Sequence, residues 1–204
     1  MTRPTPVEGE PLYELPGDLA RLEAVRGSIL FLDWTWLRGH DRYDAYVARI
    51  EDEHKSALLG AATSDWVPLA TTLAHYRALD SIGLTQREAF DVGRLVGERV
   101  HGAMLATILR LAGGLGASPW LALKQAHKMW ERTWRGGGID VRRVHERRAR
   151  VESVRNPLAI SPFFRASFSG AFAVGIDSLC KTSRVEEEPR ERGPESFVLT
   201  VEWA

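Results

Sequence analysis

A helical stretch near the middle of the chain carries the side chains with the clearest chemical potential. It opens at Ser118-Pro119, closes at the glycines 136–138 and repeats apolar residues every three or four positions. The side chains on this stripe are Trp120, Leu123, His127, Trp130 and Trp134. That spacing places them all on one face of a helix. An imidazole among three indoles is either a hydrogen-bonded core histidine or a ligand of a bound cofactor, and the residues alone leave both interpretations open.

Other titratable residues are interpreted as structural. His101 could face His127 across a helix pair, but a half-exposed structural histidine is the more common case. The carboxylates between Asp33 and Glu53 lie on polar stretches and predict a solvated face. Six arginines between residues 142 and 155 make one strand pair basic, and we expect the glutamates 186–188 to neutralise them. The sequence contains no P-loop, dinucleotide-binding or serine-hydrolase motif.

Composition restricts the size of the fold and its partners. With 204 residues and 44% hydrophobic content, the chain can bury one core, so we expect a single domain over residues 25–204. Basic and acidic residues each total 27, which argues against a nucleic-acid partner. Cys180 is the only cysteine, which excludes an internal disulfide and favours a reducing compartment. No segment has the character of a signal peptide or a membrane span, so we expect a cytoplasmic protein.

The order of elements predicts an α+β fold, in which an N-terminal helical layer packs on a C-terminal antiparallel sheet. Prolines in residues 1–24 predict a flexible N-terminal arm, and the run 28–32 is interpreted as a strand or as the entry of a buried helix. Helical periodicity predicts helices over residues 41–59, 66–82, 85–111 and 118–136. The remainder predicts two strands that turn near residues 145–147, a helix opening at Ser161-Pro162, and strands near 181–185 and 197–203.

This order, with helices before two strands, a helix and a final hairpin ending in Trp203, resembles one superfamily. Its members are haem-nitric oxide/oxygen-binding domains, four-vinyl reductase domains and Golgi transport-particle (TRAPP-like) subunits. Within it, the chain is most similar to a set of myxobacterial paralogues of about this length, through Ser64-Asp65-Trp66-Val67-Pro68-Leu69, Lys128-Met129-Trp130 with its glycine turn, and the closing strand. The resemblance spans residues 25–204 and implies a ligand-binding or assembly module that is not an enzyme.

The gas-sensing branch of this superfamily implies a haem site that can be compared residue by residue. In that branch, a histidine late in the helix before the sheet ligates the iron, and a Tyr-x-Ser-x-Arg motif on a following strand binds the haem propionates. His127 stands at a similar place, and Ser153 and Arg155 match the last two positions of the motif. Val151 stands where the tyrosine should be, so the phenol donor is missing. A haem-binding gas sensor with His127 as the proximal iron ligand is therefore the alternative function.

The main prediction is a non-enzymatic sensory or regulatory module for a small hydrophobic ligand or a protein partner. It rests on the density of aromatic residues, which would line a pocket between the helices and the sheet. The candidate pocket residues are Trp120, His127, Trp130, Trp134, Phe164 and Phe168. Such a pocket should enclose a few hundred Å³. The superfamily often dimerises, so the resemblance also implies a homodimer; no catalytic residue is assigned, and haem is the one cofactor considered.

Overall fold

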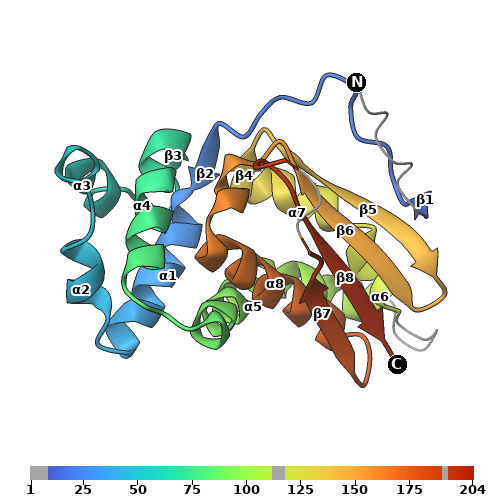
Figure 1. Cartoon of the computed structure of the whole chain (residues 1–204). Helices are drawn as coiled ribbons and strands as arrows, with labels where there is room; N and C mark the ends of the chain where they lie inside the picture. The colour runs from blue at the N-terminus through green and yellow to red at the C-terminus, as the bar shows by residue number, and fades with distance from the viewer. Residues whose placement is uncertain (1–8, 112–117, 190–192) are drawn as a thin grey trace.

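The computed structural model describes residues 9–111, 118–189 and 193–204, apart from several side chains between residues 101 and 111 (Figure 1). Short helices gather at one end of the molecule and an antiparallel sheet forms the other end. Two long helices, α5 (Gln86–Leu111) and α8 (Pro162–Asp177), lie between them. The predicted α+β architecture is confirmed.

The N-terminal unit contains helices around a small three-stranded sheet. Its helices are α1 (Gly27–Gly39), α2 (Tyr43–Val47), α3 (Asp52–Leu59) and α4 (Leu69–Ser81). Its antiparallel strands, in the order β3-β2-β4, are β3 (Trp66–Pro68), β2 (Ala24–Arg26) and β4 (Trp134–Arg135). Because β4 comes from the second half of the sequence, this sheet fastens the N-terminal unit to the rest of the molecule.

The larger sheet has five strands in the order β1-β5-β6-β8-β7. They are β1 (Glu10–Pro11), β5 (Gly138–His145), β6 (Arg148–Val154), β8 (Phe197–Trp203) and β7 (Ser183–Glu187). Val141, Val151 and Leu199 stand opposite one another on three neighbouring strands, and each is at most 1% exposed. The alternation of the strands therefore turns one apolar face toward the core, as their sequence period requires.

Three short elements complete the fold: α6 (Pro119–Leu123), α7 (Ala126–Thr133) and the 3-10 turn η1 (Pro157–Ile160). The predicted hairpin turn at residues 145–147 and the helix start at Ser161-Pro162 are confirmed, and Ser161 caps α8 by accepting from Phe164 N at 3.1 Å. The closing strands are also present, with β7 two residues later than expected.

Several predicted helices have different boundaries. Residues 28–32 belong to helix α1, residues 41–59 form two helices instead of one, and residues 118–136 divide into α6, α7 and β4. The helix predicted from Trp66 begins only at Leu69. Pro68 explains that delay, because the residue before a proline is driven out of the helical region into an extended conformation.

Helices α5 and α8 cross at close range because glycines face each other's backbone. A Cβ atom on Gly93 would lie 1.7 Å from the carbonyl oxygen of Ser167, and one on Gly170 would lie 2.0 Å from that of Phe90. Since no side chain fits at either position, these glycines set the separation of the two helices that support the sheet.

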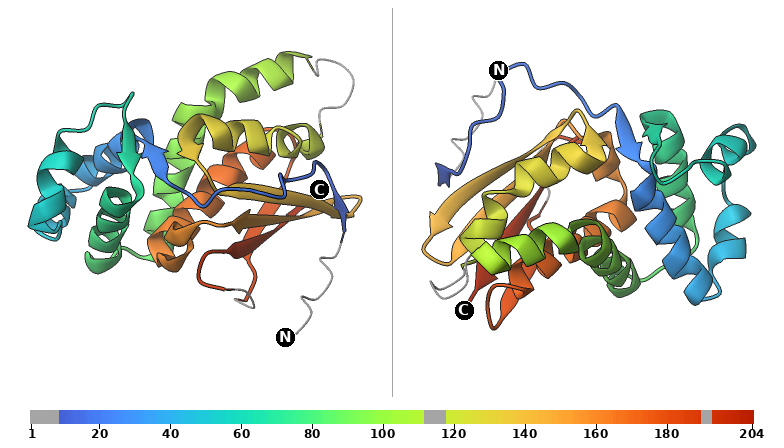
Figure 2. Two further views of the ribbon diagram at one scale, coloured as in Figure 1. Left: turned by 90° about the horizontal axis from the view of Figure 1, so that it is seen from above. Right: turned by 180° about the vertical axis from the view of Figure 1, so that it is seen from behind.

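The N-terminal arm lies along both sheets (Figure 2). Strand β1 pairs with the edge of β5, and Leu12 N donates to Val141 O at 2.8 Å. Further along, Leu22 N donates to Arg155 O at 2.9 Å. The part of the predicted arm from residue 9 onward is thus hydrogen-bonded to the sheets, whereas residues 1–8 lie outside the described residues. The division into an arm and a domain stays a prediction.

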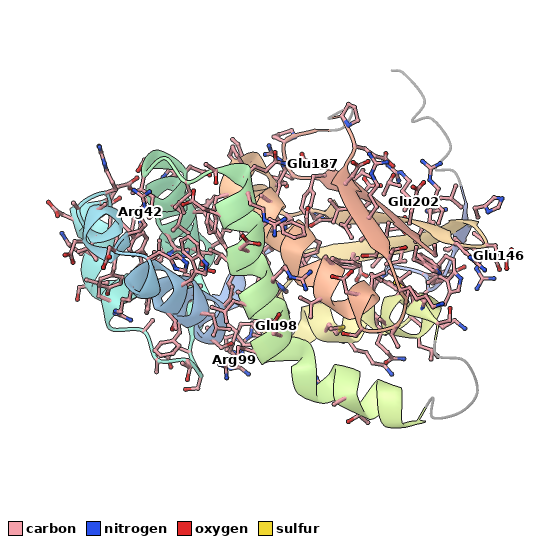
Figure 3. All side chains as sticks on the ribbon, turned by 90° about the horizontal axis from the view of Figure 1, so that it is seen from below. Arg42, Glu98, Arg99, Glu146, Glu187 and Glu202 are labelled. Atoms are coloured by element: carbon pink, nitrogen blue, oxygen red, sulfur yellow. The ribbon has the colours of Figure 1, made fainter. Side chains whose placement is uncertain are left out.

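Among the described residues, the predicted neutralisation of the six arginines by the glutamates 186–188 is found at Arg150, whereas Arg142 and Arg148 pair with Asp140 and Glu202 instead. Arg150 contacts Glu152 at 3.1 Å and Glu188 at 3.5 Å, and Arg165 on α8 contacts Glu187 at 2.6 Å. Figure 3 shows Glu187 and Glu202 on the last hairpin, with Glu146 at the tip of the neighbouring one. In the part of the chain that the structure describes, no helix combines the length and apolarity needed to cross a bilayer.

Candidate functional site

An apolar cavity of about 80 Å³ lies where α5, α7, α8 and β5 meet. Four of the six candidate pocket residues line it, namely Trp130, Trp134, Phe164 and Phe168. The N-terminal unit reaches the cavity through Ile29 of α1 and Tyr76 of α4. The cavity is smaller than the few hundred Å³ expected from the sequence. For scale, an apolar cavity of about 150 Å³ can hold benzene or xenon.

The aromatic side chains leave little space because they pack against one another. Trp130 and Trp134 stack with ring centroids 4.9 Å apart, and Trp134 meets the edge of Phe164 at 5.6 Å. Phe168 contacts Phe197 of β8 edge to face at 5.3 Å. The Trp130 indole donates to Gly136 O at 3.0 Å, so its polar atom is satisfied away from the cavity. These rings build most of the core between the helices and the sheet.

Trp120 lies outside the cavity. Its indole Nε1 donates to Glu146 O at 2.9 Å, and its ring meets that of Trp203 at 4.8 Å. The Arg143 guanidinium lies 4.5 Å from the same ring. Trp120 therefore fastens α6 to the β5–β6 hairpin and to the end of β8. The chain breaks between α6 and α7, and Trp120 and Trp130 contact different neighbours. On one continuous helix, both side chains would have pointed from the same face.

His127 also lies outside the cavity and contacts the N-terminal arm. Its ring centroid is 4.5 Å from that of Tyr13, whose hydroxyl donates to Ile139 O. Burial is the main reason that the pKa of Tyr13 lies well above its ordinary value. The Nδ1 atom of His127 is buried without a hydrogen-bond partner among the described residues. The histidine thus lies on the side of α7 that contacts the N-terminal arm and does not line the cavity.

The remaining residues of the haem comparison do not line the cavity either. Ser153 accepts a hydrogen bond from Asn156 Nδ2 at 3.0 Å and is 1% exposed. Arg155 is exposed, and its backbone has a φ of 53°. Val151 belongs to the apolar face of the sheet. The structure does not bring these side chains together with His127 on the cavity.

A buried polar network lies in the N-terminal unit, and the sequence did not reveal it. Trp34 Nε1 donates to the Tyr46 hydroxyl at 3.0 Å, and that hydroxyl lies 2.7 Å from His75 Nδ1. His75 Nε2 lies 3.0 Å from Asp33 Oδ2. A neutral His75 with its proton on Nε2 satisfies all three contacts, because Tyr46 then donates to Nδ1 and His75 donates to Asp33.

Asp33 corrects the interpretation of the early carboxylates as one solvated face. It is 1% exposed, its Oδ1 atom has no partner among the described residues, and burial raises its pKa above the ordinary value. The sequence spacing could have predicted this burial, because Ile29, Asp33 and Leu37 recur every four residues and so lie on one helix face. His101, the other titratable candidate, has its side chain outside the described residues.

Comparison with known proteins links this arrangement to one fold. No family model matches the chain, and no curated protein matches its sequence. An H-NOX (haem-NO-binding) protein from K. algicida in the Fe(II) unliganded form superposes with a TM-score of 0.58 at 11% identity, over 88% of this chain and 96% of that one. A point mutant of it gives 0.59 at 10% identity over the same shares.

A third solved structure, from work on haem distortion in the H-NOX family, gives a TM-score of 0.57 at 11% identity and covers 87% of this chain and 94% of that one. The chain has the fold of an H-NOX domain. At such low identity the likeness establishes the fold, and the side chains of this chain must show what the site can hold.

These side chains do not fit haem in the arrangement described. A cavity of about 80 Å³ is far smaller than the 300 Å³ or more, roughly, that ligand pockets enclose. His127 contacts Tyr13 instead of the cavity, and the Ser153 hydroxyl already has a partner in Asn156. The feature in favour of haem is the unpartnered, buried Nδ1 of His127, but the His127 ring packs against Tyr13 and does not line the cavity. The cavity itself is suited to a smaller apolar molecule.

Proposed function

We propose that this protein is a non-enzymatic sensory domain with the H-NOX fold, and that its input is a small apolar molecule. The observation that carries the proposal is the cavity between α7, α8 and β5, which is lined largely by aromatic and aliphatic side chains. Its walls come from the N-terminal unit as well as from the sheet side, through Ile29 and Tyr76. An occupant would therefore contact both units and could change how they pack.

Haem is the second candidate for the ligand, and the comparisons favour it over an unspecified apolar compound. Of the similar structures reported above, one comes from work on haem distortion and another is an H-NOX protein in the Fe(II) unliganded form. Haem binding by this chain would make it a gas sensor with His127 as the candidate iron ligand. It would first require His127 to leave Tyr13 and the cavity to widen, because neither condition is met in this arrangement.

An ultraviolet-visible spectrum tests the two candidates. The protein would be purified from cells supplied with a haem precursor, and its spectrum recorded before and after dithionite and carbon monoxide. Direct binding of a small molecule predicts no stoichiometric Soret band. A stoichiometric band that disappears in His127→Ala but persists in His145→Ala, an exposed histidine at the hairpin, would establish haem and contradict direct binding.

Further features of the proposal come from the resemblance and from composition. We include in it a cytoplasmic location, a homodimer and a protein partner downstream, with no nucleic-acid partner. The likeness to myxobacterial paralogues is part of the same proposal. Size-exclusion chromatography with light scattering would test the dimer, and a mass of 22.8 kDa at all concentrations would contradict it.

A further inference from the structure

Two buried residues of the cavity wall carry hydroxyl groups that have no hydrogen-bond partner in the part of the chain that the structure describes. Tyr76 is 3% exposed and Ser167 is 8% exposed, and both line the cavity. Neither hydroxyl has a partner among the described residues. The unpartnered atoms that are fully buried are Asp33 Oδ1 and His127 Nδ1, and the two hydroxyl oxygens are not among them. Each hydroxyl therefore keeps some open surface, and both residues line the cavity.

Other polar groups in the cavity wall are satisfied by the protein. Thr133 Oγ1 donates to Met129 O and Trp130 O at 3.2 and 3.3 Å, and the indole of Trp130 donates to Gly136 O. A serine in a helix can bond to the carbonyl four residues earlier, as Ser169 and Ser178 do within and just after α8. Ser167 makes no such bond to Phe163 among the described residues. Buried polar groups are almost always hydrogen-bonded in native proteins, so this pair requires an explanation.

The Tyr76 hydroxyl keeps its proton at any ordinary pH and can therefore donate a hydrogen bond. Burial, with the carboxylates of Asp33 and Asp80 and the hydroxyl of Tyr46 nearby, raises the pKa of Tyr76 well above its ordinary value of 10.0. Ser167 comes from α8 and Tyr76 from α4, so the two residues line the cavity from different units of the fold. Two donors at one apolar cavity suit an oxygen that has two lone pairs.

We propose that the ligand of this cavity is a small carbonyl compound whose oxygen accepts hydrogen bonds from Tyr76 and Ser167 while its apolar part contacts the surrounding rings. The proposal rests on the proposed function, because it specifies the chemistry of the molecule that the cavity holds. The cavity volume of about 80 Å³ limits the enclosed part to a few heavy atoms, such as a short ketone. Hydrocarbons of the same shape would leave both hydroxyls unpaired and should bind less tightly.

The test compares two probes of matched shape, butan-2-one and 2-methylbut-1-ene, which differ in C=O against C=CH₂. The full chain would carry ¹³C-labelled isoleucine methyl groups, since Ile29, Ile139 and Ile176 line the cavity. Shifts of these methyl signals give the dissociation constant of each probe. We expect the ketone to bind about 10-fold more tightly than the alkene in the unchanged protein.

Two variants identify the hydroxyls. Tyr76→Phe with Ser167→Ala should remove the ketone preference or reverse it, since the alkene is the more apolar probe. Ser167→Ala alone, which removes one small hydroxyl, should reduce the preference about 3-fold. The single variant keeps the test valid if the double variant does not fold. Thr72→Val on α4, which removes a buried hydroxyl that bonds to backbone and does not line the cavity, should leave the preference unchanged.

Xenon separates failure of this inference from failure of the proposed function. If xenon shifts the same methyl signals but the ketone is not preferred, or the variants keep the preference, the carbonyl inference is wrong and the cavity proposal stands. If neither xenon nor either probe shifts the signals, the cavity takes no ligand and both proposals are wrong. Xenon binding together with a hydroxyl-dependent ketone preference supports both.

Discussion

At the scale of single residues, the buried carboxyl group of Asp33 is energetically the most costly group for the fold to accommodate. It is almost fully buried, and its contact with His75 supplies a partner for only one of its two oxygens. Removing a carboxylate from water is costly unless hydrogen bonds or opposite charges compensate. Burial therefore outweighs the contact with His75 and raises the pKa of Asp33. The network of His75, Tyr46 and Trp34 fixes one arrangement of α1, α2 and α4 around this group.

This raised pKa predicts a pH-dependent stability. The folded state binds a proton at Asp33 more tightly than the unfolded chain does, so the stability it contributes is lost as pH rises from about 4, the unfolded pKa, through the folded pKa. Asp33→Asn removes this dependence. In urea unfolding, the difference in free energy between the unchanged protein and the variant should fall with rising pH, by about 1.4 kcal/mol for each unit of pKa shift. Asp44→Asn, an exposed neighbour, should show no such trend.

Tyr46 gives a second residue-level prediction. Its hydroxyl serves both Trp34 and His75, so Tyr46→Phe leaves two buried polar groups without a partner. The variant should lose about 2–6 kcal/mol in the free energy of unfolding, because each of the two unsatisfied buried groups costs about 1–3 kcal/mol. The control is Tyr43→Phe on the same helix, where the side chain is half-buried. Equal losses in the two variants would mean that the network adds nothing to stability.

At the scale of elements, the crossing of α5 and α8 depends on Gly93. Gly93→Ala would place a Cβ 1.7 Å from Ser167 O, so the helices must separate and the cavity wall must shift. We expect a loss of at least about 3 kcal/mol, the upper range for overpacking a core. Gly102→Ala is a matched control on the same helix, with no atom within 4 Å of the added Cβ, and it should stabilise the protein by up to about 1 kcal/mol. Thermal unfolding of both variants would show the contrast.

The elements also show what sequence reasoning could and could not reach. Strands β5, β6 and β8 and helix α8 follow from alternation, helical period and the Ser161-Pro162 start, because local pattern and tertiary burial agree there. The break between α6 and α7 accompanies a hydrogen bond from Trp120 to the β5–β6 hairpin, 26 residues away along the chain, which local periodicity does not report. Periodicity gave Trp130, Trp134, Phe164 and Phe168 as cavity residues, but it could not exclude His127, since its position depends on Tyr13 from the arm.

At the scale of the whole molecule, the arm joins parts that are far apart in the sequence. Residues 9–23 contact β5 at one end and the loop after β6 at the other, through backbone hydrogen bonds from Leu12 and Leu22. Between these points, Leu15 and Leu19 lie within about 3.2 Å of the position that a Cβ on Gly138 would occupy. Ile139 and Ala126 line the cavity, and the arm contacts the residues next to them in sequence, Gly138 and His127. The arm therefore covers these two segments of the cavity wall.

Tyr13 is the side chain on which this cover depends, and its removal makes the last prediction. Tyr13→Ala deletes both the contact with His127 and the hydrogen bond to Ile139 O, whereas Tyr13→Phe deletes only the latter. Amide hydrogen exchange at Leu12 should therefore accelerate strongly in Tyr13→Ala and weakly in Tyr13→Phe, because local opening follows the loss of buried contacts. The ladder between β6 and β8, which the arm does not touch, serves as the internal control. Acceleration across that ladder as well would mean that the arm is part of the global folding unit, and unchanged exchange at Leu12 would mean that backbone pairing with β5 holds the arm without Tyr13.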